Sequence, residues 1–194
     1  MKIIGLTGGT GSGKSVVSRY MEAHGAVIVD ADLVSRQIVE KGKPAYLEIC
    51  AFFGAEILDT DGNILRRKLG EIVFHDKEKL AFLNQCTHRY IREEMLGQIE
   101  AVKKEGTAPY VILDAPLLFE AKLEEICDVV WVVYADANVR AKRVMERDGV
   151  TYDLAMARIS NQKSWEEYKA KADAVIDNSK DIVYLQEQIR LLLG

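Results

Sequence analysis

Residues 8–15 read Gly-Gly-Thr-Gly-Ser-Gly-Lys-Ser and directly follow the apolar run Ile3-Ile4-Gly5-Leu6. This octapeptide satisfies the G-x-x-x-x-G-K-[ST] pattern of a phosphate-binding loop (P-loop), whose glycines let successive backbone N–H groups surround phosphate oxygens. The pattern predicts that Lys14 reaches the outer phosphates and that the Ser15 hydroxyl is a ligand of Mg²⁺. The expected nucleotide-binding residues are Gly9, Thr10, Gly11, Ser12, Gly13, Lys14 and Ser15.

The segments on either side of the loop favour this interpretation over a flexible linker rich in Gly and Ser. A strand-like run precedes the loop, and apolar residues recur at helical spacing after it, at Val17, Tyr20 and Met21. Gly25 is a plausible C-terminal cap for that helix. Strand, loop and helix in this order predict binding of a nucleoside triphosphate with Mg²⁺.

Length and composition limit the classes of protein that remain. The 194 residues suit one domain with insertions, and 26 basic against 30 acidic residues give a formal net charge of -4, so no nucleic-acid partner is expected. No apolar stretch approaches the roughly 20 residues of a membrane span, so we expect a cytoplasmic protein without a membrane partner. The spacing of Cys50, Cys86 and Cys127 favours reduced thiols over disulfides or a zinc site. Whether the chain forms a homo-oligomer stays open.

Five short apolar runs have the pattern of strands that are buried on both faces. They are Lys2 to Leu6, Ala26 to Asp30, Tyr110 to Asp114, Val129 to Tyr134, and Ala174 to Asp177. Helical patterns separate them, which predicts an α/β fold with a parallel sheet and ligands at the carboxyl ends of the strands. The P-loop, Asp30, Asp114 and Asn178 all fall at such ends.

Two helical excursions interrupt the strand pattern. The first, 33–106, is too long for a simple crossover and predicts an inserted subdomain with a long helix from near Lys77 to Lys104. The second, 136–171, is rich in Arg and Lys and predicts a lid that closes over phosphates. The nucleotide-binding core then consists of residues 1–32, 107–135 and 172–194.

Asp30 and Asp32 stand two residues apart where the second strand ends. If the backbone stays extended, both carboxylates point the same way, toward the P-loop. One of them can then orient or deprotonate the hydroxyl that receives a phosphoryl group. The alternative is that the pair caps the helix that begins at Leu33.

Asp114 ends an apolar strand, where a carboxylate can hold Mg²⁺ or one of its waters. The next six residues, 115–120, read Ala-Pro-Leu-Leu-Phe-Glu and are apolar where a solvent-facing turn is normally polar. Leu117 and Phe119 therefore either line a substrate pocket or plug the core, and the sequence favours neither alternative.

Two sets of basic residues have helical spacing. His88 and Arg92 are four residues apart and share a helix face that can hold an anionic substrate, although the residues alone favour a solvated basic face. Arg140, Arg143 and Arg147 follow i, i+3, i+7 spacing along one face of the second excursion. We expect at least one of these arginines to contact phosphate; the alternative is a solvated row that neighbouring carboxylates neutralise.

In combination, the motifs resemble those of the dephospho-CoA kinases. The resemblance runs from the first strand to about Leu185, and the Asp-Ala-Asp and Pro-Leu-Leu-Phe-Glu motifs are much more specific than the P-loop. The motifs that carry it are Gly5-Leu6-Thr7-Gly8-Gly9, Val29-Asp30-Ala31-Asp32, His88 with Arg92, Pro116-Leu117-Leu118-Phe119-Glu120, Arg143 with Arg147, and Asp177-Asn178.

The resemblance implies both a fold and a reaction. The fold is that of a P-loop kinase, a three-layer α/β/α arrangement around a five-stranded parallel sheet, with an inserted helical CoA-binding domain and a helical lid. Members of the family transfer the γ-phosphoryl group of ATP to the ribose 3′-hydroxyl of dephospho-CoA, which is the last step of coenzyme A synthesis. The expected partners are therefore the small molecules ATP and dephospho-CoA.

The resemblance also implies roles for individual residues. Asp32 becomes the base for the 3′-hydroxyl, assisted in catalysis by Lys14, Arg143 and Arg147. The residues and the resemblance together give these expected substrate-binding residues: Asp30, Asp32, His88, Arg92, Leu117 and Phe119. The resemblance places Arg147 and Asn178 on the nucleotide side and Ser15 at the metal, where Asp114 is expected from its position at a strand end. Two positions depart from the family pattern, since Arg89 stands where the family usually has Pro and Arg140 where it usually has Gln.

Two other readings stay open at this point. Another small-molecule P-loop kinase, such as a nucleoside or nucleotide kinase, would share the sheet, the loop and the lid. A regulatory nucleotide-binding switch would need neither the acceptor-side Asp pair nor the lid arginines, and the chain has no guanine-specificity motif of the Asn-Lys-x-Asp type.

Overall fold

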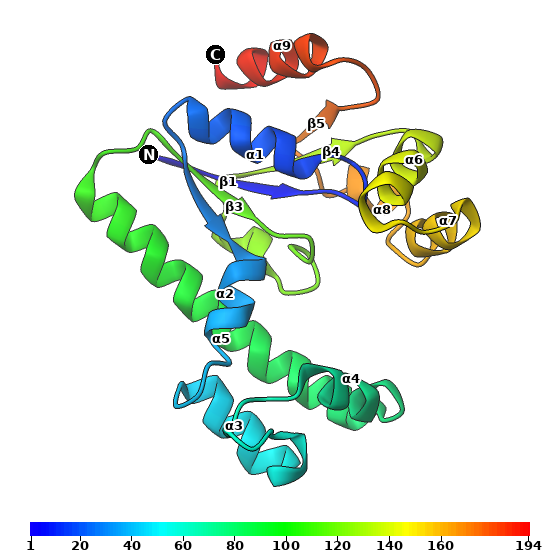
Figure 1. Ribbon diagram of the computed structural model, residues 1–194. Helices are drawn as coiled ribbons and strands as arrows, with labels where there is room; N and C mark the ends of the chain where they lie inside the picture. Colours follow the sequence, from blue (N-terminus) through cyan, green and yellow to red (C-terminus); the bar gives the residue numbers. More distant parts are fainter. The chain divides into compact units, whose positions relative to one another are not determined.

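The structure, a computed structural model, describes residues 1–194 and contains one five-stranded parallel sheet with the strand order β2-β3-β1-β4-β5 (Figure 1). β1 lies at its centre and pairs in parallel with β3 on one side and β4 on the other, while β5 pairs with β4. The predicted α/β class is therefore confirmed. The strands are β1 (Lys2–Thr7), β2 (Val27–Asp30), β3 (Tyr110–Asp114), β4 (Val129–Tyr134) and β5 (Ala174–Asp177).

Helices fill the segments between the strands, and local sequence signals set their ends. The longest, α5, begins where the Asp76 side chain accepts hydrogen bonds from the N–H groups of Glu78 and Lys79, each at 3.0 Å, and it ends at Gly106 with φ +66°. The α-helices are α1 (Lys14–Ala23), α2 (Ala31–Gln37), α3 (Pro44–Phe53), α4 (Arg66–Phe74), α5 (Lys77–Glu105), α6 (Ala137–Asp148), α7 (Tyr152–Ser160), α8 (Trp165–Lys169) and α9 (Ile182–Leu193). Two short 3₁₀ helices complete the set, η1 (Ala55–Ile57) and η2 (Leu123–Ile126).

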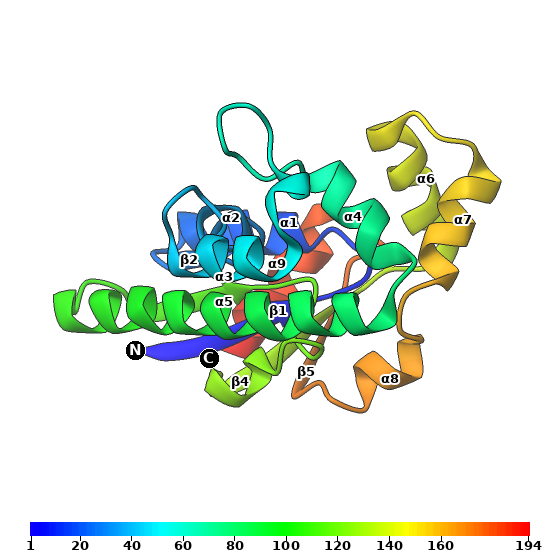
Figure 2. The ribbon, with the colours of Figure 1, turned by 90° about the horizontal axis from the view of Figure 1, so that it is seen from below.

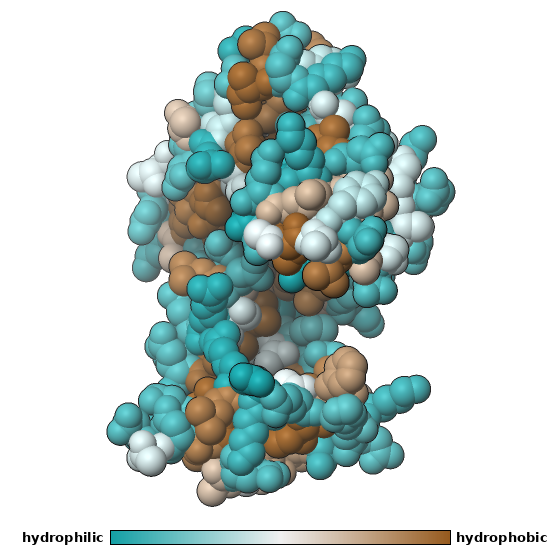
Figure 3. Space-filling model, turned by 45° about the vertical axis from the view of Figure 1, so that its right-hand side comes forward, coloured by the Kyte–Doolittle hydropathy of each residue, from teal (hydrophilic) through white to brown (hydrophobic).

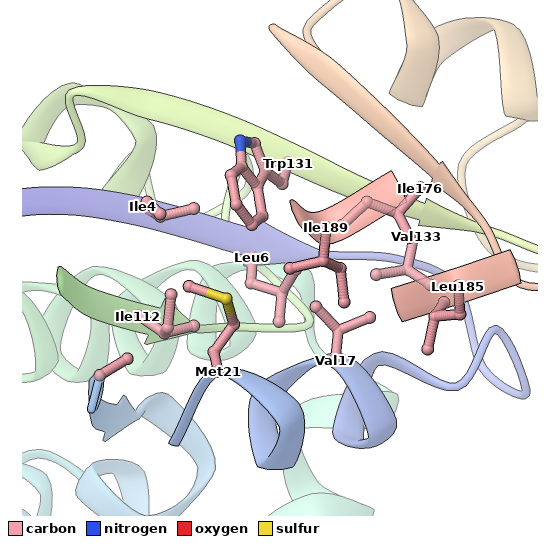
Figure 4. Packing of buried hydrophobic residues seen from close by; sticks show 11 residues of the cluster. Ile4, Leu6, Val17, Met21, Ile112, Trp131, Val133, Ile176, Leu185 and Ile189 are labelled. Atoms are coloured by element: carbon pink, nitrogen blue, oxygen red, sulfur yellow. The ribbon is translucent and has the colours of Figure 1, made fainter. Parts of the chain in front are cut away.

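The hydrophobic core lies between one face of the sheet and the helices α1 and α9 (Figure 4). Ile4 and Leu6 of β1 alternate with Gly5 and are fully buried against this layer, together with Met21 of α1 and Ile189 of α9. Cutting a buried leucine such as Leu6 to alanine typically costs about 2–5 kcal/mol of stability, so this layer holds the P-loop on a rigid base.

The other face of the sheet is covered so closely at β1 that Gly5 has no room for a side chain. A Cβ there would lie 2.8 Å from the Cys127 sulfur and 3.2 Å from a methyl carbon of Leu118. Both residues belong to the segment that joins β3 to β4, which includes η2. Any larger residue at this position would push that segment away from the sheet.

The chain divides into two compact units, one formed by residues 1–29 and 102–194 and the other by residues 30–101. The first unit contains the P-loop, most of the sheet and the segment 136–171, in which α6 and α7 pack through a small core of their own. In both Figure 1 and Figure 2 the helices α6, α7 and α8 follow the carboxyl end of β4.

The second unit is helical and contains α2, α3, α4 and most of α5. Phe52 of α3 stacks on Phe82 of α5 with ring centroids 3.7 Å apart. The loop before α4 is a turn held by Asp59, whose Oδ1 accepts hydrogen bonds from the N–H groups of Asp61 at 2.9 Å and Asn63 at 2.8 Å. These backbone hydrogen bonds, that of Asn63 above all, hold the pKa of Asp59 below its usual value.

Hydrophobic side chains at the surface occur in separate patches among hydrophilic ones on the face drawn in Figure 3. Phe74 and Leu191 are the most exposed of the large apolar residues. None of the helices combines the length and apolar character that crossing a membrane would take.

Candidate active site

The P-loop joins the carboxyl end of β1 to the N-terminus of α1. Gly11 and Gly13 have φ values of +75° and +86°, in the left-handed region, and a Cβ at Gly13 would collide with the side-chain amide of Asn178. The first turn of α1 has no acidic residue and no side-chain cap. The helix dipole therefore favours an anion at this end of α1.

Lys14 and Asp114 come together beside the loop, although 100 residues separate them. The Lys14 ammonium pairs with one oxygen of the Asp114 carboxylate, and the Ser18 hydroxyl donates to the other. Asp114 is only 7% exposed, so the paired lysine offsets the cost of burying its charge. Ser18 was missed in the sequence, yet it lies four residues after Lys14 and thus on the same face of α1, a spacing that could have indicated it.

Side chains from the segment 136–171 bind both the N–H and the carbonyl group of Thr10. Gln162 Oε1 accepts a hydrogen bond from Thr10 N–H at 2.8 Å, and Arg140 Nε donates to the Thr10 carbonyl at 2.9 Å. Arg140 Nη2 also donates to Gln162 Oε1 at 2.8 Å, which closes the set of contacts. We call Arg140 and Gln162 the Thr10 clamp. Burial lowers the pKa of the Arg140 guanidinium from its usual value.

Arg143 and Asn178 hold the next turn of the loop by its carbonyl groups. Arg143 Nη1 donates to the carbonyls of Gly11 and Ser12, both at 3.3 Å, and Nη2 donates to the Asn178 carbonyl at 2.9 Å. The Asn178 amide donates to the Ser12 carbonyl at 2.7 Å. With these carbonyls engaged from outside, the loop is fixed in shape, so both side chains act on the P-loop backbone in this structure.

Arg147, the third arginine of the row, does not contact the loop. It forms two hydrogen bonds to the Asp148 carboxylate, from Nε at 2.7 Å and from Nη2 at 3.0 Å. Arg158 of α7 donates to the same carboxylate at 2.6 Å. Hydrogen bonds from Arg147 and the two positive charges hold the pKa of Asp148 below its usual value. Of the three arginines Arg140, Arg143 and Arg147, only Arg147 is therefore neutralised by a neighbouring carboxylate, as the alternative for this row had it.

The apolar segment after β3 is divided between core and surface. Leu118 and Phe119 are buried, whereas Leu117 is 57% exposed. The Lys171 ammonium lies 4.9 Å above the Phe119 ring centre, and Glu120 pairs with Lys163 at 3.2 Å, so this segment also contacts the part of the chain around α8. Phe119 therefore plugs the core, and Leu117 is the residue left facing solvent.

In the second unit, Asp30 and Asp32 have different surroundings. Asp30 is the N-cap of α2, and its Oδ1 accepts hydrogen bonds from the N–H groups of Asp32 at 2.8 Å and Leu33 at 3.1 Å. The condition of an extended backbone across the pair is not met, because α2 begins at Ala31; the alternative of a helix cap applies to Asp30. The Asp32 carboxylate is exposed and has no hydrogen bond or ion pair within the chain.

His88 and Arg92 are half-buried on α5, one helical turn apart, as their spacing predicts. Their neighbour Arg89 points elsewhere: its guanidinium and the Tyr90 hydroxyl both bind the Glu48 carboxylate of α3. Desolvation alone would raise the pKa of Glu48, but the hydrogen bonds from Tyr90 and Arg89 outweigh it and hold that pKa below its usual value. Arg89 thus ties α5 to α3.

A glycine loop at a helix N-terminus, a lysine and a buried carboxylate beside it, and arginines that grip the loop on a parallel sheet together define a P-loop kinase. The comparisons with known proteins narrow this class. A family model described as dephospho-CoA kinase matches residues 2–183. The chain belongs to the dephospho-CoA kinase family.

Individual relatives agree with this assignment. A protein named dephospho-CoA kinase from Carboxydothermus hydrogenoformans is 46% identical over 193 residues, which cover 100% of this chain and 93% of that protein. A Thermus thermophilus crystal structure has a TM-score of 0.83 at 29% identity, covering 99% of this chain and 96% of that one. Dephospho-CoA kinase from Campylobacter jejuni has a TM-score of 0.71 at 30% identity, with 98% and 95% covered. The chain is thus a nucleotide-binding transferase, and a kinase family implies ATP as its co-substrate.

Proposed function

We propose that the protein transfers the γ-phosphoryl group of ATP to the ribose 3′-hydroxyl of dephospho-CoA and releases coenzyme A and ADP. The choice of dephospho-CoA as acceptor is supported by the extent of the family match, which includes the helical unit 30–101 as well as the P-loop core. The loop geometry supports the donor. Participation in coenzyme A synthesis and a cytoplasmic location belong to the same proposal and rest on the family alone.

On the donor side, the phosphates are bound by the Lys14 ammonium and by N–H groups of the loop other than those of Thr10 and Ser12, which donate within the chain. Lys14 exchanges its pairing with Asp114 for the outer phosphates of ATP. The Ser15 hydroxyl and the Asp114 carboxylate suit Mg²⁺, because this ion prefers oxygen ligands and both groups lie beside the loop. When bound, Mg²⁺ would neutralise charge on the phosphate oxygens.

On the acceptor side, Asp32 serves the nucleophile. Its carboxylate has no partner within the chain, which leaves it able to accept the proton of the 3′-hydroxyl. The 3′-oxygen then forms a bond to the γ-phosphorus as the bond between that phosphorus and the bridging oxygen of ADP breaks. His88 and Arg92 bind the acceptor, while Asp30 acts by capping α2 and so fixes the helix that carries Asp32.

The lid arginines have two different tasks in this proposal. Arg143 positions the loop through its carbonyls, and Arg140 does so through Thr10. Arg147 is the arginine that reaches phosphate when ATP is bound. Leu117, exposed after β3, contributes to the acceptor site, and Asn178 supports the nucleotide side of the loop.

The experiment is an ADP-release assay with Mg-ATP against dephospho-CoA and a panel of nucleosides and nucleoside monophosphates. We expect turnover with dephospho-CoA and a product that comigrates with coenzyme A. Phosphorylation of nucleosides or nucleoside monophosphates with dephospho-CoA left unchanged would replace this acceptor by that of a nucleoside or nucleotide kinase. Slow ATP hydrolysis without any acceptor would indicate a regulatory switch instead.

A further inference from the structure

Two surface pockets lie within the helical unit 30–101, and their charges are opposite. The larger, of about 610 Å³, lies between the end of α2 and α5 and is lined by Glu40, Glu93 and Glu94 against one ammonium, that of Lys43. The smaller, of about 240 Å³, has three cations and one carboxylate in its wall. Its lining residues are Arg36, Val39, Glu40, Lys41, Asn63, Ile64 and Arg66. We call this smaller cavity the basic pocket.

The larger pocket does not suit an anionic acceptor. Its carboxylates repel phosphate groups at any pH where they are ionised. It is also on the wrong face of α5, because Tyr90, Glu93 and Glu94 lie about half a turn around the helix from His88 and Arg92 at 3.6 residues per turn. The charge of the lining residues therefore favours the smaller pocket over the larger one as the site for an anionic group.

The basic pocket draws its cations from three separate segments. Arg36 lies in the last turn of α2, Lys41 lies in the turn that follows, and Arg66 is the first residue of α4. Arg36 and Arg66 form no ion pair, whereas Arg67 next door pairs with Glu71 at 3.1 Å. Lys41 donates one hydrogen bond to the Asp61 carbonyl at 2.8 Å, so its charge is not neutralised. Two guanidinium groups left unpaired around one cavity suit a phosphate, which they bind bidentately.

The α4 helix adds to this field. Its N-cap, Leu65, provides no side-chain hydrogen bond, and the first turn has no acidic residue and begins with the unpaired Arg66. Cations at a helix N-terminus oppose the helix dipole, so this arrangement lowers stability unless an anion is nearby. By contrast, α2 and α5 begin behind the aspartates Asp30 and Asp76.

The basic pocket is linked to the proposed reacting centre by a helix face. Asp32 and Arg36 are four residues apart on α2 and hence lie on the same side, about 6 Å apart along the axis. In dephospho-CoA the diphosphate is attached to the 5′ carbon of the same ribose whose 3′-hydroxyl is the acceptor. If the ribose 3′-hydroxyl is at Asp32, the diphosphate lies one sugar ring away from it. This separation is similar to the distance between Asp32 and Arg36 along α2.

We propose that the basic pocket formed by Arg36, Lys41 and Arg66 binds the 5′-diphosphate of the acceptor. This inference rests on the proposed function, since that function supplies the diphosphate. It makes Arg36 and Arg66 specificity-determining residues, because a nucleoside without a 5′-phosphate gains nothing from them.

The test compares Arg36→Met and Arg66→Met with the wild type, and with Arg67→Met as the matched control. Methionine keeps the apolar stem and removes the charge, and Arg67 is exposed, paired with Glu71 and outside the pocket. We expect kcat/KM for dephospho-CoA to fall about tenfold to a hundredfold in each pocket variant, as for a lost hydrogen bond to a charged group. KM for ATP stays within twofold, and Arg67→Met behaves as the wild type. Unchanged kcat/KM in both pocket variants overturns the proposal.

A binding arm separates this proposal from the proposed function. Inorganic pyrophosphate is titrated calorimetrically into the wild type and all three variants with the P-loop saturated by ADP and Mg²⁺. Tenfold weaker pyrophosphate binding in Arg36→Met and Arg66→Met, but not in Arg67→Met, supports the pocket even if dephospho-CoA is not a substrate. Equal binding by all four proteins overturns it, and inorganic phosphate that binds as tightly as pyrophosphate overturns the assignment to a diphosphate.

Discussion

Replacing Gln162 with Met tests the Thr10 clamp most directly. Methionine has nearly the same length as glutamine but cannot accept the hydrogen bonds that Gln162 Oε1 receives from Thr10 N–H and Arg140 Nη2, both at 2.8 Å. The first is a neutral hydrogen bond, worth about 0.5–1.5 kcal/mol net, and the second involves a charged donor, worth about 1.5–3 kcal/mol. The two together set the loss at about 2–4.5 kcal/mol.

Part of this free energy is lost from the stability of the fold, and part is lost from ATP binding because the loop is no longer held in shape. We expect a lower free energy of unfolding by about 2 kcal/mol and a rise in KM for ATP of about tenfold, since each tenfold corresponds to about 1.4 kcal/mol. KM for dephospho-CoA stays within twofold, because the clamp acts on the donor loop alone. The ADP-release assay measures both KM values, and urea unfolding measures the stability.

The matched control is Gln162→Glu, which keeps a side-chain oxygen in the same place and strengthens the contact with Arg140. It should retain a near wild-type KM for ATP. The reasoning would be refuted by a Gln162→Met variant with wild-type stability and wild-type KM for ATP. It would equally be refuted if Gln162→Glu and Gln162→Met lost the same amount, because then the acceptor oxygen is not what matters.

Three further predictions concern other groups. Asp32→Asn should lower kcat by roughly a hundredfold to ten-thousandfold with ATP binding retained. Asp30→Asn keeps a good N-cap and should stay near wild-type activity in the same assay. Equal losses in the two variants would contradict the proposed division of roles between Asp30 and Asp32. Arg147→Ala should raise KM for ATP much more than KM for dephospho-CoA, and the reverse pattern would put this arginine on the acceptor side. Burial raises the pKa of Cys86 to about 11 and of Cys127 to about 12. At pH 8 about one thiol in a thousand or fewer is then a thiolate at these positions, so a chromogenic disulfide should label them only after denaturation; rapid labelling of either in the native protein would show that it is not shielded.

The sheet could be read from the sequence because its signals are local. Each strand is a short apolar run of β-branched residues, and three of them have the predicted bounds, with the other two one residue different at one end. The P-loop was equally readable, since a strand, the Gly-rich loop and an amphipathic helix are contiguous. Such features depend on a few neighbouring residues and need no knowledge of the rest of the chain.

The contacts around the loop could be predicted only in part. The sequence left two interpretations open for Asp30 and Asp32. In the structure the Asp30 carboxylate caps α2, so the backbone becomes helical at the next residue and is not extended as far as Asp32. The contact of Gln162 with Thr10 joins residues 152 positions apart and follows no spacing rule, so no local sequence pattern could predict it. The spacing of the arginine row assigned Arg143 to the predicted lid, but its hydrogen bonds to loop carbonyls depend on the packing of α6 against the P-loop.

Asp148 has two arginine partners where one would suffice, Arg147 from its own helix and Arg158 from α7. A carboxylate left without a counter-charge would resist the departure of its only arginine. If Arg147 reaches phosphate as proposed, Arg158 still neutralises Asp148, so the carboxylate keeps a counter-ion while Arg147 is away. Arg158 would then lower the electrostatic cost of that movement in both directions.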